Sequence, residues 1–546
     1  MNYSKIKTIP DFFYECTARY SKRDSLSFSD ETPLTYKDVF NRVTFLSNKL
    51  KQDGLKTGDK VAILSENSPS WVIAYFSISC AGGVIVPILP DFHQKEVVNI
   101  LEHAEVSRIY ISKKHLPKIK DVENKYKVMI LEEIFQNEDF SSIKDEPLEE
   151  RETSAKPEDL ALIIYTSGTT GSSKGVMLSH RNIISNVFGS KHIPPLRHYD
   201  RALSVLPLAH TYEGTLGLYV PFLRGATIFY LKKPPSTSVL LPALKKIRPG
   251  MMLTVPLLME KIYTGIKTTK IQKSRLLSSM YKKGFTRFIA NRLIGISLKK
   301  TFGGKLRFYG IGGAPLSEET EIFLKQAKFP YAIGYGLTET SPLLAGDNAK
   351  NTKFRSTGRF LSEVEHKLDL TKGKDGNGEI LVRGPNIMMG YYKDPEKTKE
   401  VLSEDGWFRT GDLGVVKNGY LTIKGRIKNM ILSANGENIY PENIENLINK
   451  EAFVEECLVF HDEETKTLVA KIHLNYDNFN EHIKNLPKSA GVFQEDISNY
   501  LQEIKERINS ELGRFSRVNE VMEQKEPFIK TPTLKIKRFL HSKRKE

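Results

Sequence analysis

The segment that most constrains the fold of this chain is a loop of small and hydroxyl-bearing residues, Tyr165-Thr-Ser-Gly-Thr-Thr-Gly-Ser-Ser-Lys-Gly-Val-Met177. The apolar run Leu160-Ala-Leu-Ile-Ile164 precedes the loop, and Leu178-Ser-His-Arg-Asn-Ile-Ile184 follows it. This order predicts a strand, a loop and then a helix.

The composition of this loop suits an anion. Glycines allow backbone N–H groups to converge on a phosphate, and the N-terminus of a following helix adds positive potential. Hydroxyl groups can bond to phosphate oxygens or Mg²⁺, and Lys174 supplies a mobile cation. The segment is not a Walker A loop, because it lacks the pattern G-x-x-x-x-G-K-[ST]. We predict a phosphate-binding loop, with a flexible Ser/Gly linker as the alternative.

Helical and strand-like patterns alternate along the first part of the chain, which is typical of a layered α/β domain. The helical pattern covers residues 36–51, and strands are expected at 60–64 and 84–88. The stretch from Trp71 to Pro90 carries no charge and is long enough to span a membrane. Its serines and the pair Gly82-Gly83 instead favour a buried helix up to about Cys80, a glycine turn and a buried strand.

Length and cysteine content limit the number of domains and the cellular compartment that we expect for this protein. A chain of 546 residues is expected to form two or three domains. Its three cysteines are scattered and odd in number, which indicates a reducing cytosol and no metal cluster. The N-terminus lacks the apolar core of a signal peptide, so we expect a cytoplasmic protein. Residues 139–159 are charged and predict an exposed connection.

The net charge of +16 is unevenly distributed. Residues 261–317 contain thirteen Lys and Arg but no Asp or Glu, and apolar residues are interleaved at 275–290. One or two basic amphipathic helices are expected there. They would suit an anionic membrane surface or an acidic protein partner, and an ordinary solvated face is the alternative. Nucleic acid is disfavoured, because no recognition motif accompanies the charge.

Three further segments have site-like chemistry. Residues 307–315 predict a strand that enters a glycine turn, where a flat ring could lie against the backbone. Residues 331–342 offer Tyr335 for stacking, with Thr338 and Glu339 for phosphate and metal. Asp412, expected in a tight turn, could accept two ribose hydroxyls. Taken alone, each segment is as consistent with a structural turn as with a binding site. The order and spacing of all three segments together are hard to obtain by chance.

Together these motifs resemble the adenylate-forming superfamily of acyl-CoA synthetases, luciferases and peptide-synthetase adenylation domains. The resemblance covers nearly the whole chain, from Leu34 to Lys535. Leu206-Pro-Leu-Ala-His-Thr-Tyr-Glu213 and Thr531-Pro-Thr-Leu-Lys-Ile-Lys-Arg538 are similar to the long-chain fatty acid branch. Many other branches have a glycine where this chain has Leu534.

The resemblance implies an α/β fold in which a large layered N-terminal domain with several sheets precedes a small, mobile α+β C-terminal domain. The boundary is expected at residue 427/428, so that residues 1–427 bind ATP and the acid and residues 428–546 close over them. The hinge would be Lys428, although other members have Asp there.

The resemblance also implies roles for individual residues. The β- and γ-phosphates would be held by Thr166, Ser167, Gly168, Thr169, Thr170, Gly171 and Lys174. The nucleoside would contact Gly312, Gly313, Ala314, Tyr335, Gly336, Thr338, Asp412 and Arg426. Mg²⁺ would bind Glu339 and Thr166. His210 would lie beside the acyl carboxylate, Gly436 would line the thiol path, and Lys535 would bridge the carboxylate and the α-phosphate.

The implied activity is that of an AMP-forming acid–thiol ligase that uses ATP and Mg²⁺. A medium- or long-chain fatty acid would become an acyl-adenylate and then a thioester with coenzyme A. The phosphopantetheine arm of an acyl carrier protein is the alternative acceptor, since the acid-free stretch would suit an acidic protein. A catalytically inactive binding protein is disfavoured, because every motif residue is intact. Peripheral contact with the inner membrane surface stays open.

Overall fold

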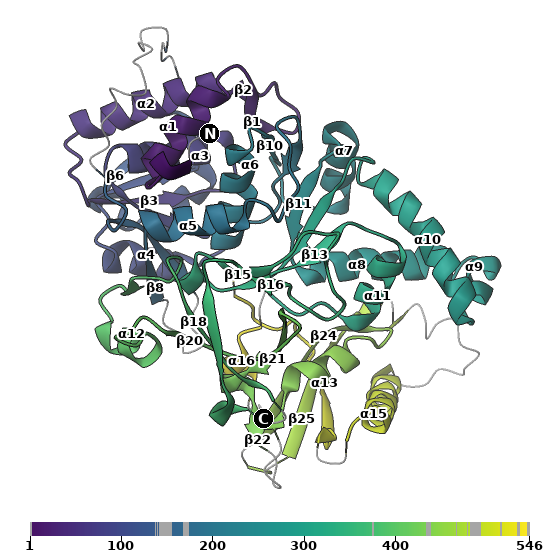
Figure 1. The fold of residues 1–546 in the computed structure, drawn as a ribbon. Coiled ribbons are helices and arrows are strands. Elements are labelled where there is room, and N and C mark those ends of the chain that lie inside the picture. The colour runs from purple at the N-terminus through teal and green to yellow at the C-terminus, as the bar shows by residue number, and fades with distance from the viewer. Residues whose placement is uncertain are drawn as a thin grey trace.

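Two largely parallel sheets form the main part of the molecule (Figure 1). The structure is a computed structural model that describes residues 3–136, 138, 140, 155–166, 174–373, 376–432, 438–462, 464–465, 467–477, 479–480, 493–513, 516–531 and 536–542. Seven of the predicted site residues lie outside this range: Ser167, Gly168, Thr169, Thr170, Gly171, Gly436 and Lys535.

The first sheet has the strand order β13-β12-β11-β9-β10-β1-β2 within the described residues. All neighbouring strands are parallel except β1 and β2. Its strands are β1 (Asp24–Phe28), β2 (Leu34–Thr35), β9 (Arg201–Leu203), β10 (Thr227–Tyr230), β11 (Met251–Thr254), β12 (Phe308–Ile311) and β13 (Tyr331–Ile333).

The second sheet has the order β19-β8-β7-β4-β3-β5-β6. It is parallel from β7 to β6, whereas β8 runs antiparallel to both of its neighbours. Its strands are β3 (Lys60–Leu64), β4 (Val84–Ile88), β5 (Arg108–Ile111), β6 (Lys127–Ile130), β7 (Leu160–Thr166), β8 (Lys174–Ser179) and β19 (Gly390–Tyr391).

Helices cover these two sheets, as expected for a layered α/β domain. Several begin with side-chain caps; Thr35 and Asp38, for example, form a capping box at the start of α2. The helices before the third sheet are α1 (Ile9–Arg19), α2 (Tyr36–Gln52), α3 (Pro69–Cys80), α4 (Gln94–His103), α5 (His180–Ser190), α6 (Val220–Leu223), α7 (Thr237–Ile247), α8 (Pro256–Ile266), α9 (Arg275–Tyr281), α10 (Gly284–Thr301) and α11 (Glu318–Gln326). Two π-helical segments, η5 (Glu213–Tyr219) and η6 (Lys267–Ile271), adjoin α6 and α8.

Smaller antiparallel sheets follow. One contains β14 (Tyr335–Gly336), β15 (Leu343–Gly346) and β16 (Arg359–Phe360). Another contains β17 (Glu365–Asp369), β18 (Gly378–Arg383), β20 (Phe408–Lys417) and β21 (Tyr420–Arg426). Helix α12 (Pro395–Val401) lies between β19 and β20 in sequence.

The last part of the chain forms the predicted α+β unit, drawn from green to yellow in Figure 1. Its three-stranded sheet, β24 (Val454–Asp462), β25 (Thr467–Leu474) and β26 (Glu520–Glu523), packs with α13 (Pro441–Ile448) and α15 (Phe493–Glu511). The pair β22 (Ile431–Leu432) and β23 (Asn438–Ile439) precedes it, and α16 (Arg538–His541) follows. One hydrophobic cluster, with members from Ile439 to Val518, forms the core of this unit separately from the two clusters of the larger part.

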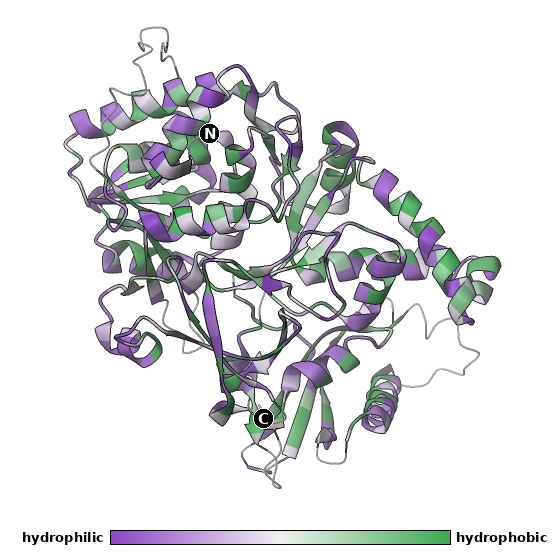
Figure 2. Ribbon diagram, in the orientation of Figure 1, coloured by the Kyte–Doolittle hydropathy of each residue, from purple (hydrophilic) through white to green (hydrophobic). Residues whose placement is uncertain are grey.

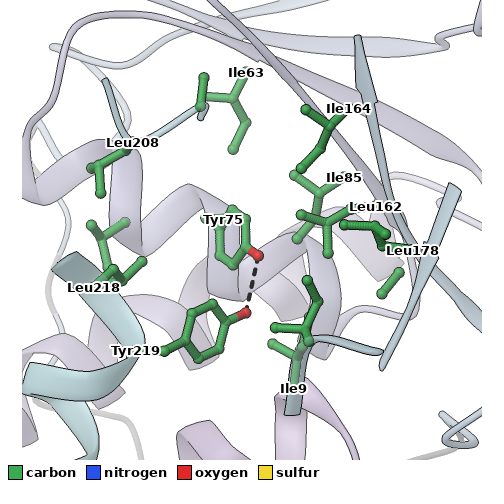
Figure 3. Close-up of a cluster of buried hydrophobic side chains, with 14 of the residues drawn as sticks. Ile9, Ile63, Tyr75, Ile85, Leu162, Ile164, Leu178, Leu208, Leu218 and Tyr219 are labelled. Carbon is green, nitrogen blue, oxygen red and sulfur yellow. Dashed lines mark hydrogen bonds between the residues drawn. The ribbon is translucent and has the colours of Figure 1, made fainter. Parts of the chain in front are cut away.

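The uncharged stretch from Trp71 to Pro90 is confirmed as core. Helix α3 ends at Cys80, Gly82 adopts φ +86° at the turn, and β4 follows with all five residues buried. Figure 3 shows part of the cluster around α3, in which the Tyr75 hydroxyl accepts a hydrogen bond from Tyr219 at 3.0 Å. Within the part of the chain that the structure describes, no helix combines the length and hydropathy that crossing a bilayer requires.

The prediction of strand, loop and helix around the phosphate loop needs one correction. Residues 174–179 form β8, which pairs antiparallel with β7 in a register that places Thr166 opposite Lys174. The helix α5 begins only at His180, capped by Ser179. The loop therefore joins two strands of a hairpin, and the expected helix N-terminus does not adjoin it.

Candidate active site

The turn after β12 and the strand β14 meet at one edge of the first sheet. Strands β12 and β13 are parallel neighbours, so the residues that follow them lie together at the carboxyl edge. Gly312, Gly313 and Ala314 follow β12, and Tyr335 follows β13 by two residues. Gly313 has φ +86°, a conformation that favours glycine. The structure thus brings together the glycine turn and the aromatic ring that the sequence singled out.

Close contacts with neighbouring atoms explain two of these glycines. A Cβ atom at Gly336 would lie 1.9 Å from the carbonyl oxygen of Pro342, so no side chain fits there. At Gly312 a Cβ atom would lie 3.1 Å from Cζ of Tyr212. The ring of Tyr212 therefore packs directly against the glycine turn. Sequence reasoning missed Tyr212 as a neighbour of the site, although it lies only two residues after His210.

Asp412 joins Tyr335 to Arg426. The buried Asp412 carboxylate accepts a hydrogen bond from Oη of Tyr335 at 2.8 Å and another from Nε of Arg426 at 2.9 Å. Burial first, and then the charge of Asp412, raise the pKa of Tyr335 well above its usual value, so the ring stays a neutral donor. The pKa of Arg426 is raised chiefly by the charge of Asp412.

The location of Asp412 differs from the expected tight turn. It lies inside β20 and is directly opposite Arg426 of β21 in the antiparallel register. Gly411, with φ +69°, supplies the irregularity that the sequence pattern suggested. Because the two strands are paired, the carboxylate and the guanidinium are held by a sheet rather than by a turn.

Glu339 and Lys174 meet at Tyr391, a residue that the sequence did not single out. The Tyr391 hydroxyl donates a hydrogen bond to Oε1 of Glu339 at 2.9 Å, and Nζ of Lys174 lies 4.8 Å from the centre of the Tyr391 ring. Strand β19 positions this ring, because it pairs with β8, which begins at Lys174. Only a pairing between segments about 200 residues apart reveals this link, so the local sequence held no signal for it.

The electrostatics of the site favour an anionic ligand. Burial lowers the pKa of Lys174, and the positive charge of Lys428 lowers it further. The charge of Glu339 influences both Lys174 and Arg426, which places the two groups of side chains within electrostatic reach of each other. Three cationic side chains, Lys174, Lys428 and Arg426, are thus linked electrostatically to two carboxylates, Glu339 and Asp412.

The His210 loop reaches the same region through buried polar contacts. Nδ1 of His210 accepts a hydrogen bond from the backbone N–H of Tyr212 at 3.2 Å. The Asn67 amide donates to Oγ of Ser204 at 3.0 Å, and its oxygen accepts from the backbone of Leu208 at 2.8 Å. These bonds tie the end of β3 to the loop that carries His210.

A buried carboxyl group follows this loop. Glu213, at the start of η5, is 1% exposed, and its Oε2 has no hydrogen-bond partner among the described residues. Burial raises its pKa to about 8, and a hydrogen bond with Ser204 opposes the rise. The raised pKa favours the protonated, uncharged form of Glu213 at neutral pH.

Two of the predicted site residues carry oxygen atoms that could bind a divalent cation. Thr166 is the last residue of β7, and Glu339 offers a half-buried carboxylate. A hydroxyl and a carboxylate are ligands that Mg²⁺ prefers. Thr338 lies with Glu339 in the short helix η7 (Thr338–Thr340). Among the described residues, no group of three or more His, Cys, Asp or Glu is arranged to hold a metal ion.

The chain is similar to a known enzyme family and to characterised relatives. Residues 13–392 match the family model described as AMP-binding enzyme. Long chain acyl-CoA synthetase 6, peroxisomal, of Arabidopsis thaliana is 32% identical, with 92% of this chain and 79% of that protein covered. The human long-chain-fatty-acid–CoA ligase ACSBG2 is 28% identical, with 81% of this chain and 73% of that protein covered.

A solved structure shares the fold. O-succinylbenzoate coenzyme A synthetase (MenE) from Bacillus subtilis, in complex with ATP and magnesium ion, superposes with a TM-score of 0.73 at 21% identity, over 97% of this chain and 98% of that one. The fold prediction, a large layered α/β part followed by a small α+β domain, is confirmed. The chain belongs to the AMP-binding enzyme family.

Proposed function

We propose that this protein is an AMP-forming acid–thiol ligase that activates a medium- or long-chain fatty acid and transfers it to coenzyme A. The observation that carries the proposal is the convergence of Asp412, Arg426 and Tyr335 with Lys174 and Glu339 beside the glycine turn. The similarity to long-chain acyl-CoA synthetases supports the substrate class.

The nucleotide is assigned to the site by chemistry. A buried carboxylate that already accepts from two donors has lone pairs left for ribose hydroxyls, and Asp412 is such a group. The adenine ring would lie between Tyr335 and the turn Gly312–Ala314. Lys174, with the loop Ser167–Gly171 that precedes it, would bind the β- and γ-phosphates.

Adenylation is an attack of one anion on another. The ionised carboxylate of the fatty acid attacks the α-phosphorus of ATP and displaces pyrophosphate, so no general base is required. Glu339 and Thr166 would hold Mg²⁺, which would supply charge neutralisation. Lys535 would bridge the carboxylate and the α-phosphate, and His210 would lie beside the carboxylate. Tyr391 would keep Glu339 oriented.

The second step needs a different arrangement of the C-terminal unit. We propose the domain boundary between residues 1–427 and 428–546, with the hinge at Lys428, which lies in the short 3-10 helix η9 (Ile427–Asn429) that follows β21. The separate core of the C-terminal unit supports a movement as one body. Rotation would withdraw Lys535 and bring Gly436 beside the path of the thiol, which attacks the mixed anhydride and releases AMP.

Coenzyme A is the proposed acceptor, and the phosphopantetheine arm of an acyl carrier protein is the alternative. The experiment offers purified protein ATP, Mg²⁺ and palmitate with either coenzyme A or holo acyl carrier protein and compares the rates of thioester formation. A clear preference for coenzyme A is expected. Thioester formation only with the carrier protein would replace the acceptor, and no thioester with either would contradict the proposal.

A cytoplasmic location with peripheral contact at the inner membrane surface completes the proposal. Long fatty acids partition into bilayers, so an enzyme that uses them gains access to substrate there. The supporting observation is the acid-free, basic stretch 261–317.

A further inference from the structure

Helix α10 has two apolar faces, and only one of them is covered by protein. Ala290, Ile294 and Leu298 are buried against the domain. On the opposite side Phe285 is 77% exposed and Ile296 is 61% exposed. With 3.6 residues per turn, Phe285, Ile289 and Ile296 fall within about 40° of one another around the helix axis. They therefore form a single outward-facing stripe.

The neighbouring helix extends this surface. Leu276 of α9 is 72% exposed. The apolar surface, which we call the hairpin patch, consists of six large side chains that stay exposed on α9 and α10: Leu276, Phe285, Phe288, Ile289, Leu293 and Ile296. Exposed apolar side chains that cluster in this way mark interaction sites, whereas scattered ones need no explanation. Figure 1 shows that α9 and α10 project at one edge of the molecule, and Figure 2 shows hydrophobic and hydrophilic residues alternating along them.

Positive charges surround the hairpin patch. Arg275, Lys282, Lys283 and Lys300 are exposed, and no acidic residue occurs between positions 261 and 317. Among the described residues, no ion pair neutralises these four side chains. Within the described residues, Lys267 and Arg307 of this stretch do form ion pairs, with Glu319 and Asp200, which lie outside it.

Apolar side chains surrounded by unneutralised cations match the boundary between headgroups and acyl chains of an anionic bilayer. A purely electrostatic contact would need only the lysines and arginines, and it would not account for two exposed phenylalanines. An acidic protein partner would need an apolar groove, in addition to its acidic surface, to cover the outward-facing stripe of α10.

We propose that the α9–α10 hairpin inserts its exposed apolar side chains into the surface of an anionic membrane, with the surrounding lysines and arginines bound to lipid phosphates. The inference deepens the proposed peripheral contact and rests on the proposed function only for its biological purpose. Insertion adds a component of binding that salt does not screen, which distinguishes it from electrostatic attachment.

The test measures cosedimentation of the full-length protein with phosphatidylcholine vesicles that contain or lack phosphatidylglycerol. Binding to the anionic vesicles is expected at low salt, with a residual fraction bound at about 1 M NaCl, where the Debye length is about 3 Å. The variant Phe285→Ser/Leu293→Ser/Ile296→Ser should lose the salt-resistant fraction. The variant Lys282→Glu/Lys283→Glu should bind at least about tenfold more weakly at low salt.

Matched controls use equivalent changes elsewhere on the surface. Leu370 is 58% exposed, so Leu370→Ser removes an exposed apolar side chain outside the hairpin. Lys350 and Lys372 are exposed lysines, and their joint replacement by Glu makes the same change in net charge. Both controls should bind vesicles as the unmodified protein does. Thermal unfolding of every variant should match the unmodified protein, because the altered side chains are exposed.

The result that overturns the proposal is complete release of the unmodified protein by high salt, or unchanged binding of the triple serine variant. If a variant of the hairpin patch still binds vesicles but no longer transfers the acyl group to holo acyl carrier protein, the patch is a docking site for a protein. Activity toward octanoate, which is soluble without vesicles, is measured in parallel. If the unmodified protein activates neither octanoate nor palmitate, the proposed function is contradicted, and the membrane inference is judged on vesicle binding alone.

Discussion

Replacing Asp412 by asparagine removes one negative charge from the candidate site and leaves the shape of the side chain nearly unchanged. The carboxylate is 3% exposed and binds Tyr335 and Arg426 at 2.8 and 2.9 Å. In the variant, the amide oxygen can face Arg426 while the amide N–H group donates to the Tyr335 hydroxyl. Both contacts therefore persist, but the hydrogen bond to Arg426 loses its charged acceptor.

The size of the effect follows from this geometry. A hydrogen bond to a charged group contributes about 1.5–3 kcal/mol and a neutral one about 0.5–1.5 kcal/mol. Because the Arg426 side chain is 45% exposed and can be hydrated, we expect the free energy of unfolding to fall by only about 1 kcal/mol. Binding of ATP should suffer more, since the carboxylate that we propose to accept two ribose hydroxyls would be replaced by one carbonyl oxygen. A loss of about 10- to 100-fold in kcat/KM for ATP is expected.

The assay is fatty-acid-dependent exchange of pyrophosphate into ATP, measured over a range of ATP concentrations. Asp347 provides a matched control, because it is 7% exposed and accepts a hydrogen bond from Nε of the half-exposed Arg359 at 3.0 Å. Asp347→Asn should lower stability to a similar degree and leave exchange intact. Equal exchange by Asp412→Asn and the unmodified protein, or equal losses in both variants, would refute the assignment of Asp412 to the nucleotide.

Three further predictions concern the catalytic cycle, packing and pH. Lys535→Ala should slow adenylation on the order of a hundredfold or more but spare thioester formation from supplied acyl-AMP. Gly436→Leu should instead impair mainly thioester formation. The opposite pattern in assays of the two half-reactions would contradict the rotation of the C-terminal unit between them. Gly336→Ala should lower the midpoint of thermal unfolding through a loss of about 1–3 kcal/mol, while Gly265→Ala, which has open space around it, should not; equal midpoints would be inconsistent with the close backbone contact. Because burial raises the pKa of Glu213 from its ordinary 4.5 to about 8, the folded state binds more protons than the unfolded state between these values, and its stability falls as pH rises through this window by up to about 1.4 kcal/mol per unit. Glu213→Gln should remove that part of the pH dependence in thermal unfolding measured from pH 5 to 8, and an unchanged profile would count against a titrating Glu213.

Local sequence patterns sufficed where a segment is governed by its own residues. The helix at Tyr36 and the strands β3 and β4 occur where periodicity predicted them. The turn at Gly82 interrupts the uncharged stretch, so this stretch does not form one membrane-spanning helix. The glycine turn after β12 was also predicted, because a position with positive φ favours glycine, which is visible in the sequence.

Long-range pairing explains what local patterns could not show. Strand β8 was expected to be a loop that leads into a helix, and only its ladders with β7 and β19 make it a strand. Asp412 was placed in a turn for the same reason, since its partner strand β21 fixes its backbone. Tyr391 lacked any chemical signature in the sequence, because its role depends on Glu339 and Lys174 arriving from two other elements.

The exposed stripe of α10 is a further feature that the local sequence pattern could not show. The sequence shows apolar residues on several sides of this helix but does not say which side is covered. Packing of Gly295 against Ala327 of the neighbouring segment decides the buried side, and Phe285 and Ile296 are then left outside. The expected basic amphipathic surface was therefore correct in charge, and its apolar face emerged only from the fold.

The formation of the acyl-adenylate is the central claim, and it can be observed directly in a single turnover. Protein in excess over radiolabelled palmitate is mixed with ATP and Mg²⁺ without any thiol, quenched with acid and analysed for palmitoyl-AMP. We predict that palmitoyl-AMP accumulates on the protein with one pyrophosphate released for each adenylate, and that added coenzyme A converts it to palmitoyl-CoA and AMP. Formation of ADP and phosphate, or label that never appears as palmitoyl-AMP, would contradict the account.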